Sequence, residues 1–144
     1  MIYTDLTKLA MRIAFHAHKE QVDKTGVPYI FHPYHLAEQM TDEISVCAAL
    51  LHDVVEDTSL TFDDLASQGI PRKVIDVLKL LTHDDNEAYI DYIHKIRDSG
   101  NKVAITIKLA DLNHNSDNTR FGTTDDEHTD RLKRYKMAKT LLMN

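Results

Sequence analysis

Residues 44–57, ISVCAALLHDVVED, place four titratable side chains at the end of an almost wholly apolar segment. We predict a helix over this range, in which successive residues are separated by about 100° around the axis. If His52 is set at 0°, Glu56 lies at about 40° on the same side of the helix. Asp53 and Asp57 follow at about 100° and about 140°, and apolar side chains fill the remaining arc. The helix is therefore expected to be buried around most of its girth and to carry one polar stripe.

This polar stripe is electrostatically unfavourable without a cation. Asp53 and Asp57 are four residues apart, a spacing at which like charges repel on a helix, and no lysine or arginine lies within residues 50–59. Partial burial strengthens the repulsion because it lowers the effective dielectric. A divalent cation bound by His52 and Asp53 would remove it, and this ligand pair suits Mn, Fe or Zn better than Ca. A solvated acidic face is the alternative interpretation of this helix alone.

The rest of the chain is predicted to be helical as well. Apolar side chains recur at helical spacing in several further segments, and Gly26 with Pro28 marks a loop between the first two. Pro33 is expected at the first helical position of its segment, and Thr61 with Asp64 resembles a capping box. The further predicted helices cover residues 5–21, 33–41, 62–68, 72–81, 87–98 and 126–142.

Residues 103–110 have an ambiguous pattern. Their β-branched residues alternate with smaller or polar ones, a period of two that favours a strand. No second convincing strand is present to pair with it, and an isolated strand would leave its backbone groups unpaired. We therefore predict a buried helix here, and an all-α fold of roughly seven or eight helices.

Bulk composition narrows the class of protein further. A chain of 144 residues is expected to form one domain, residues 1–144. Its net charge of −6 and the lack of a Lys/Arg-rich patch argue against a nucleic-acid partner. The single cysteine, Cys47, points to a reducing compartment. No apolar run approaches about 20 residues, so we expect a cytoplasmic protein without a membrane partner.

A metal site needs ligands beyond His52 and Asp53. The segment FHPYH offers His32 and His35, and KLADLNHN offers Asp111, with Asn115 one turn later on the same helix face. A lone histidine is more often structural than a ligand, and the chain contains nine. We assign His16, His18, His83, His94 and His128 to structural or surface positions.

Three segments together resemble a known family. They are HKEQVDKTGVPYIFHP, AALLHDVVEDT and KLADLNHN, which lie in order between residues 18 and 115. The sequence resembles the HD superfamily of metal-dependent phosphohydrolases, and in particular the small stand-alone hydrolases of the RelA/SpoT type, which act on the alarmone ppGpp. A fourth motif, RLKRY at 131–135, matches more weakly. The resemblance implies an all-α HD-domain bundle, in agreement with the helical pattern.

The resemblance also implies roles for individual residues. It makes four residues the ligands of one divalent ion, with Mn²⁺ as the usual metal and Fe, Zn or Mg as alternatives: His32, His52, Asp53 and Asp111. Glu56 and Asp57 become the catalytic pair of acidic residues beside the attacking water. Lys24 becomes a phosphate contact and Asn115 a nucleotide contact, and Arg131 and Tyr135 match residues that approach the substrate. Each accessory residue also has a purely structural interpretation, such as a solvated loop lysine for Lys24 and a helix cap for Asn115.

The expected reaction is hydrolysis of the 3′-diphosphate of ppGpp or pppGpp to GDP or GTP and pyrophosphate. Two departures from the family bear on the substrate, because relatives often carry an arginine where this chain has Asp23 or Leu112. Both remove positive charge near a site for a polyphosphate. Two alternatives therefore stay open, an HD-type phosphohydrolase of another nucleotide and a non-catalytic nucleotide-binding module. The oligomeric state is not indicated by the sequence.

Overall fold

The computed structural model describes residues 1–121 and 126–144, with side chains described outside residues 122–128. Within these residues the regular structure is helical, and one isolated antiparallel bridge joins Val22 to Pro28. The predicted all-α class is confirmed. The chain divides into two compact units, Met1–Thr82 and His83–Asn144.

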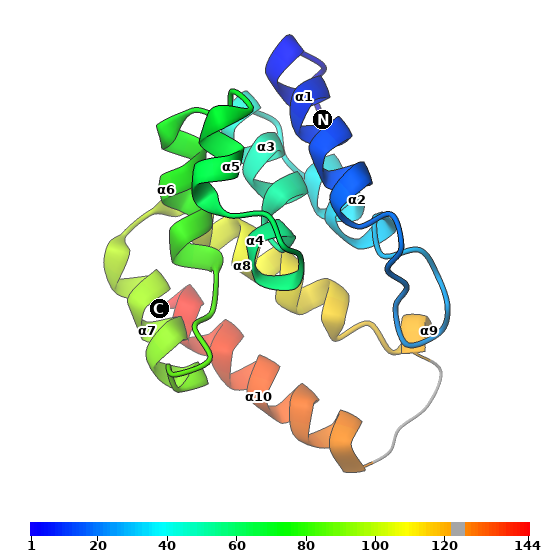
Figure 1. The fold of residues 1–144 in the computed structure, drawn as a ribbon. Coiled ribbons are helices and arrows are strands. Elements are labelled where there is room, and N and C mark those ends of the chain that lie inside the picture. The colour runs from blue at the N-terminus through cyan, green and yellow to red at the C-terminus, as the bar shows by residue number, and fades with distance from the viewer. Residues whose placement is uncertain (122–125) are drawn as a thin grey trace. The chain divides into compact units, whose positions relative to one another are not determined.

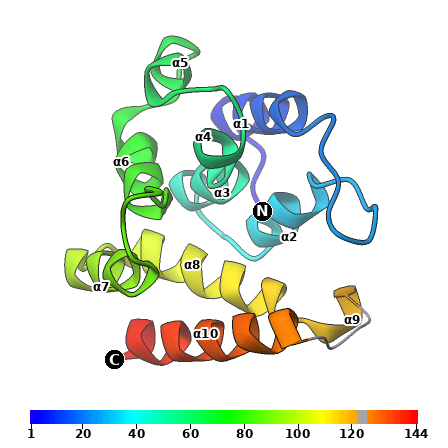
Figure 2. The ribbon, with the colours of Figure 1, turned by 60° about the horizontal axis from the view of Figure 1, so that its bottom comes forward.

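The first unit contains six helical segments (Figure 1). They are α1 (Asp5–Ala17), α2 (Phe31–Glu38), α3 (Glu43–Leu51), α4 (Val54–Asp57), α5 (Phe62–Ser67) and α6 (Arg72–Leu81). Helix α3 packs against α1, α2 and α6, which lie around it in Figure 2. Its residues 45–51 are all buried, because small side chains such as Ala48 and Ala49 allow neighbouring helices to approach closely. The apolar run of the sequence is thus the centre of this unit.

Two details of the first unit differ from the prediction. The segment 44–57 does not form one helix, because α3 ends at Leu51 and a turn at His52 and Asp53 precedes α4. Helix α2 begins at Phe31, so Pro33 is its third residue instead of its first. Proline is tolerated there because the first four N–H groups of a helix have no intrahelical partner.

The helix ends of the first unit follow the predicted local chemistry. The capping box at α5 is confirmed, with the Thr61 hydroxyl accepting from Asp64 N at 3.1 Å and the Asp64 carboxylate accepting from Thr61 N at 2.9 Å. The residue after the α5 C-cap, Gly69, has φ +105°, a conformation that other residues rarely adopt. Pro71 then caps the start of α6. These caps fix the path of the chain from α4 to α6.

The second unit contains α7 (Tyr89–Ser99), α8 (Lys102–Asn115), α9 (Asn118–Phe121) and α10 (Asp126–Met143). Helices α7, α8 and α10 pack on one another, and α8 lies beside α10 in Figure 2. The ambiguous segment 103–110 is helical, as predicted. Asn101 accepts from Ala104 N at 3.0 Å and so starts α8, a cap that overrides the strand-like alternation. Among the described residues, every helix is too short or too polar to cross a membrane.

Candidate metal centre

His52 and Asp53 occupy the break between α3 and α4. His52 keeps a helical backbone, with φ −59° and ψ −28°, whereas Asp53 turns to φ −106° and ψ 0°. The chain then resumes helical bonding, since Asp57 N donates to Asp53 O at 2.9 Å. The break aims the two side chains differently from a continuous helix. The predicted angular relation of Glu56 and Asp57 to His52 is therefore wrong in detail.

One hydrogen bond fixes the chemistry of the His52 ring. Its Nδ1 lies 2.7 Å from the carbonyl oxygen of Ala49. A carbonyl oxygen only accepts, so Nδ1 carries the hydrogen and Nε2 presents its lone pair. A second ring nitrogen held in this way is typical of metal-ligating histidines. The ring is 4% exposed, so water does not compete for this bond.

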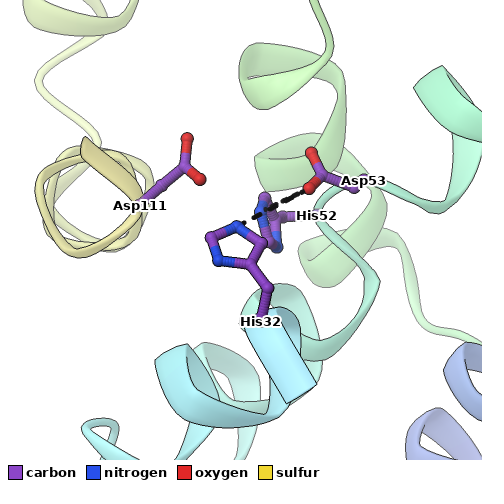
Figure 3. Close-up of side chains that lie close together, drawn as sticks. All are labelled: His32, His52, Asp53 and Asp111. Atoms are coloured by element: carbon purple, nitrogen blue, oxygen red, sulfur yellow. Dashed lines mark ion pairs between the residues drawn. The ribbon is translucent and has the colours of Figure 1, made fainter. Parts of the chain in front are cut away.

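The Nε2 atoms of two histidines face the same carboxylate (Figure 3). His52 Nε2 lies 3.0 Å and His32 Nε2 3.8 Å from Oδ2 of Asp53. The two imidazoles meet edge to face, with ring centroids 5.3 Å apart. One donor atom from each of the three residues lies within 4.8 Å of the others. The structure thus brings together three of the predicted ligands, from α2 and from the α3–α4 turn.

Tyr29 supports the carboxylate of this cluster. Its hydroxyl donates to the same Oδ2 of Asp53 that faces the two histidines. Its ring packs against His32, with centroids 5.6 Å apart. Sequence reasoning missed Tyr29, although it lies in the quoted loop motif only three residues before His32. This proximity to a predicted ligand is the sequence signal that could have identified Tyr29.

We predict that Tyr29→Phe lowers metal affinity about tenfold, as loss of a partner behind a metal ligand commonly does. The change removes one hydrogen bond to Asp53 and keeps the ring that packs on His32. Calorimetric titration with Mn²⁺ measures the effect, with Tyr3→Phe as the control, since Tyr3 is 59% exposed. Equal affinities in the two variants would contradict a supporting role for Tyr29.

His18 and Gln21 form a further layer behind Tyr29. Gln21 Nε2 donates to Asp57 O at 2.9 Å, which leaves its Oε1 to accept from His18 Nδ1 at 2.8 Å. The His18 ring lies 5.0 Å from the Tyr29 ring. Burial lowers the pKa of His18, so the ring is neutral at pH 7. The structural assignment of His18 is consistent with this position, whereas sequence reasoning missed Gln21, which ties the loop after α1 to α4.

Glu56 and Asp57 lie on the single turn α4, directly after the cluster, and both side chains are exposed. Because Asp57 is exposed, burial strengthens its repulsion of Asp53 less than the sequence suggested. Of the predicted acidic stripe, His52 is buried and Asp53 is 16% exposed. The stripe is thus divided into a buried part with ligand chemistry and an exposed part with two carboxylates.

Asp111 lies on α8 in the second unit and is drawn with the other predicted ligands in Figure 3. Its Oδ2 accepts from Lys108 Nζ at 2.9 Å and its Oδ1 accepts from Asn115 Nδ2 at 3.1 Å. The three residues lie one turn apart along the helix, which explains why their side chains meet. Asp111 is only 6% exposed, so these donors contact a carboxylate that has little access to water. Lys108 is the first residue of the quoted segment KLADLNHN, but sequence reasoning did not include it in the site.

Lys108 remains charged despite its burial. Burial would lower the pKa of Lys108, but the Asp111 carboxylate, with Tyr92 and Tyr89, raises that pKa well above its usual value. The ammonium group also lies over the Tyr92 ring, 5.1 Å from its centroid. A buried lysine that stays charged holds Asp111 in one orientation.

Lys24 lies in the loop between α1 and α2, and its side chain is exposed. The neighbouring Asp23 shapes this loop, since its Oδ1 accepts from Thr25 N at 2.8 Å and from Val27 N at 3.1 Å. Gly26, with φ +86°, completes the turn. Asp23 therefore organises the loop that presents Lys24. The second departure, Leu112, is fully buried in the second unit.

The remaining predicted substrate contacts belong to the second unit. Arg131 and Tyr135 are half-buried on α10. Arg134 lies over the rings of Tyr89 and Tyr135, 5.2 Å and 5.9 Å from their centroids. Desolvation raises the pKa of Tyr89, so its hydroxyl stays protonated at neutral pH. Arg134 is thus a cation beside Tyr135, one of the predicted substrate contacts, and the sequence alone did not indicate that the two side chains lie together.

The cluster in the first unit fits a divalent transition metal. Two imidazole nitrogens and a carboxylate oxygen are ligands that suit Mn, Fe or Zn. The His52 tautomer and the Tyr29 bond to Asp53 supply the outer contacts that commonly orient such ligands. A surface acidic cluster would lack both features.

Comparison with known proteins agrees with this chemistry. The model of the HD domain family matches residues 10–111, a range that contains His32, His52, Asp53 and Asp111. The bifunctional (p)ppGpp synthase/hydrolase SpoT of Escherichia coli is 36% identical over 122 residues, which are 74% of this chain and 17% of SpoT. MESH1 of Danio rerio, named as a guanosine-3′,5′-bis(diphosphate) 3′-pyrophosphohydrolase, is 43% identical over 58 residues, 36% of this chain and 32% of MESH1.

A solved structure shares the fold over nearly the whole chain. It is described as a metazoan orthologue of SpoT that hydrolyses ppGpp and plays a role in starvation responses. The match covers 99% of this chain and 85% of that chain, with a TM-score of 0.74 and 25% identity. The chain spans only about a sixth of the length of bacterial SpoT. The family model covers more than half of this chain, and the matched range contains the cluster of His32, His52 and Asp53, so the chain belongs to the HD-domain family.

Proposed function

We propose that this protein is a metal-dependent phosphohydrolase that removes the 3′-diphosphate of ppGpp or pppGpp as pyrophosphate. The observation that carries the proposal is the cluster of His32, His52 and Asp53, followed directly by the exposed carboxylates of α4. The names of the relatives support the substrate class. The proposal treats residues 1–144 as one hydrolase domain that acts in the cytoplasm.

The proposed ligand set is His32, His52, Asp53 and Asp111, with Mn²⁺ as the ion. The chemistry of Asp111 supports its inclusion, because Lys108 and Asn115 bond to its two carboxylate oxygens and so orient it. The HD-domain match also extends to this residue. When bound, a divalent ion of this kind withdraws electron density from water and from phosphoryl oxygens. Two imidazoles and two carboxylates leave coordination positions open for these groups.

Glu56 is proposed as the base that orients the attacking water and accepts its proton. It lies on α4, one turn after His52, and its exposure allows it to reach a substrate. Asp57 assists the proton transfer from the neighbouring position, where the Gln21 bond to its carbonyl oxygen holds the end of α4. The water oxygen bonds to the phosphorus attached to O3′, and the P–O3′ bond breaks. The ribose 3′-hydroxyl of GDP or GTP takes up a proton, and pyrophosphate leaves.

Four further side chains are proposed to contact the substrate. Lys24 offsets phosphate charge from its exposed loop position, where it forms no ion pair with any residue that the structure describes. Asn115 contacts the nucleotide, and Arg131 and Tyr135 approach it from α10. The Asp23 side chain supports the Lys24 role by holding the loop in a tight turn.

We predict that Glu56→Gln reduces pyrophosphate release by roughly a hundredfold or more, as expected for loss of a general base. The amide keeps the size of the side chain but cannot accept the proton. Mn²⁺ affinity should stay close to that of the unchanged protein, because Glu56 is not a proposed ligand. Glu20→Gln, another exposed glutamate, serves as the control and should leave both quantities unchanged. Full activity in Glu56→Gln would remove Glu56 from the mechanism.

A product assay tests the substrate. The purified protein is incubated with Mn²⁺ and ppGpp, and the nucleotides and pyrophosphate are resolved by ion-exchange chromatography. The proposal expects GDP and pyrophosphate in equal amounts. Turnover of deoxynucleoside triphosphates or nucleoside monophosphates, without pyrophosphate from ppGpp, would instead make the protein a general HD nucleotidase. Binding of ppGpp without any turnover would indicate a nucleotide-binding module.

A further inference from the structure

A cavity of about 580 Å³ lies within the first unit, lined by α1, the chain after α4 and the end of α5. Helix α1 contributes one stripe at helical spacing: Leu9, Arg12, Ile13, His16 and Ala17. The opposite wall is formed by residues 58–60 and Gln68. Figure 2 shows the connection between α4 and α5 passing beside α1. None of these residues belongs to the proposed metal ligands, catalytic acids or substrate contacts.

The floor of this cavity is aliphatic. Leu9 and Leu60 are half-buried and Ile13 is 6% exposed, so their side chains border the cavity without filling it. Gly69, two residues after the end of α5, lies against Leu9. A Cβ atom added to Gly69 would be 3.4 Å from Cδ2 of Leu9, which is ordinary van der Waals contact. Phe, Tyr and Trp are absent from the described residues that line the cavity, and the side chains of its floor are aliphatic. The floor therefore suits an aliphatic chain.

One lip of the cavity is cationic. Arg12 and His16 lie one turn apart on α1, and both are exposed. Arg12 forms no ion pair with any residue of the described ranges. The chain has 23 acidic and 17 basic residues, yet no carboxylate is among the described residues that line this cavity. A guanidinium group in this position favours an anionic head group.

The opposite wall offers neutral polar groups. The Thr58 hydroxyl is already used, since it donates to Val54 O and accepts from Leu60 N. Ser59 and Gln68 are exposed, and their side chains form no hydrogen bond within the described residues. A hydroxyl and an amide facing a cationic lip add donors for the oxygens of an anion. Apolar walls with a few converging polar groups are characteristic of small-molecule sites, and the volume lies within their range of about 300–1,000 Å³.

We propose that this cavity is a second ligand site that binds an organic anion with an aliphatic body. The head group, a carboxylate or a phosphate, pairs with Arg12 and is reached by His16, Ser59 and Gln68. The aliphatic part lies over Leu9, Ile13 and Leu60. The proposal concerns binding to the first unit and does not rest on the proposed hydrolysis.

Binding is tested on the full chain with Mg²⁺ present, by calorimetry and by backbone amide NMR. The probes are octanoate and octyl phosphate, with inorganic phosphate and octanol testing the head group and the chain alone. Both probes should bind, and they should shift the amides of residues 9–17 and 58–60. Inorganic phosphate and octanol should bind at least about tenfold more weakly, because each lacks one half of the recognition. The probe that binds more tightly, octanoate or octyl phosphate, identifies the preferred head group.

Arg12→Gln should weaken octanoate binding about tenfold or more, the effect of losing one charge-assisted hydrogen bond. Arg72→Gln is the matched control, since Arg72 is 93% exposed and lies outside the cavity. Equal affinities in the two variants, shifts confined to amides around His52 and Asp53, or no binding up to about 10 mM would each overturn the proposal. Because binding is measured without substrate, a failure here is distinct from a failure of the hydrolase proposal.

Discussion

Asp53→Asn is expected to lower Mn²⁺ affinity by more than about a hundredfold, because losing only an outer partner of a metal ligand costs about 10- to 100-fold. Oδ2 of Asp53 is the atom that faces both His52 Nε2 and His32 Nε2 and accepts from Tyr29. An amide has nearly the same size but no negative charge to offset a divalent ion. Pyrophosphate release from ppGpp should fall below detection in the same variant. Calorimetric titration and the product assay measure the two effects.

Asp76→Asn is the matched control for this experiment. Asp76 is 57% exposed on α6 and lies within 4.0 Å only of Arg72 among the described ion pairs. This control should leave metal affinity and turnover unchanged, since a surface pair of this kind contributes at most about 1 kcal/mol. If Asp53→Asn binds Mn²⁺ as tightly as Asp76→Asn does, the metal centre is wrongly assigned. Reduced turnover at unchanged metal affinity would make Asp53 a substrate contact.

Lys108→Met is expected to lower the free energy of unfolding by about 3 kcal/mol, because removing one partner leaves a buried charge uncompensated. The side chains of Lys108 and Asp111 are 12% and 9% exposed, so solvent screens their 2.9 Å ion pair only weakly. Methionine keeps an unbranched side chain and removes the ammonium group that lies over the Tyr92 ring. Urea denaturation followed by circular dichroism measures the change. Mn²⁺ affinity should also fall, by about tenfold, because Asp111 loses the group that orients it.

Two further variants separate charge from packing at this position. Lys102→Met changes an exposed lysine of the same helix and should alter stability by less than about 0.5 kcal/mol. Lys108→Arg keeps a cation and should recover a large part of the stability that Lys108→Met loses. A destabilisation in Lys108→Met no greater than that in Lys102→Met would show that the ion pair is solvated. If Lys108→Arg and Lys108→Met lower the free energy of unfolding equally, the effect comes from the packing of the lysine side chain and not from its charge.

Local sequence patterns were sufficient for the helices whose signals lie in neighbouring residues. The Thr61–Asp64 box and Gly69 bound α5 because a side chain within three residues can satisfy the end of a helix. The segment 103–110 shows the limit of periodicity alone, since its alternation favours a strand. Its helical state was predicted from the absence of a partner strand, and the Asn101 cap supplies the local reason.

The break at His52 and Asp53 was not predictable from spacing. A helical wheel assumes one continuous helix, whereas the Asp53 backbone turns between α3 and α4. The apolar pattern continues through Val54, so no change in the sequence marks the break. Only the folded chain reveals that His52 bonds to Ala49 O and that Tyr29, 24 residues before Asp53, donates to its carboxylate.

The sequence by itself determined the residue types of the candidate site and the segments that carry them. His32, His52 and Asp53 lie in recognisable motifs, because ligand chemistry depends on side-chain type and motif spacing. Tertiary structure decided which atoms face one another, how deeply each is buried and which neighbours orient them. Those properties depend on contacts between residues far apart in the chain, such as Gln21 with Asp57. For the same reason, the cavity between α1 and residues 58–60 became visible only in the folded protein.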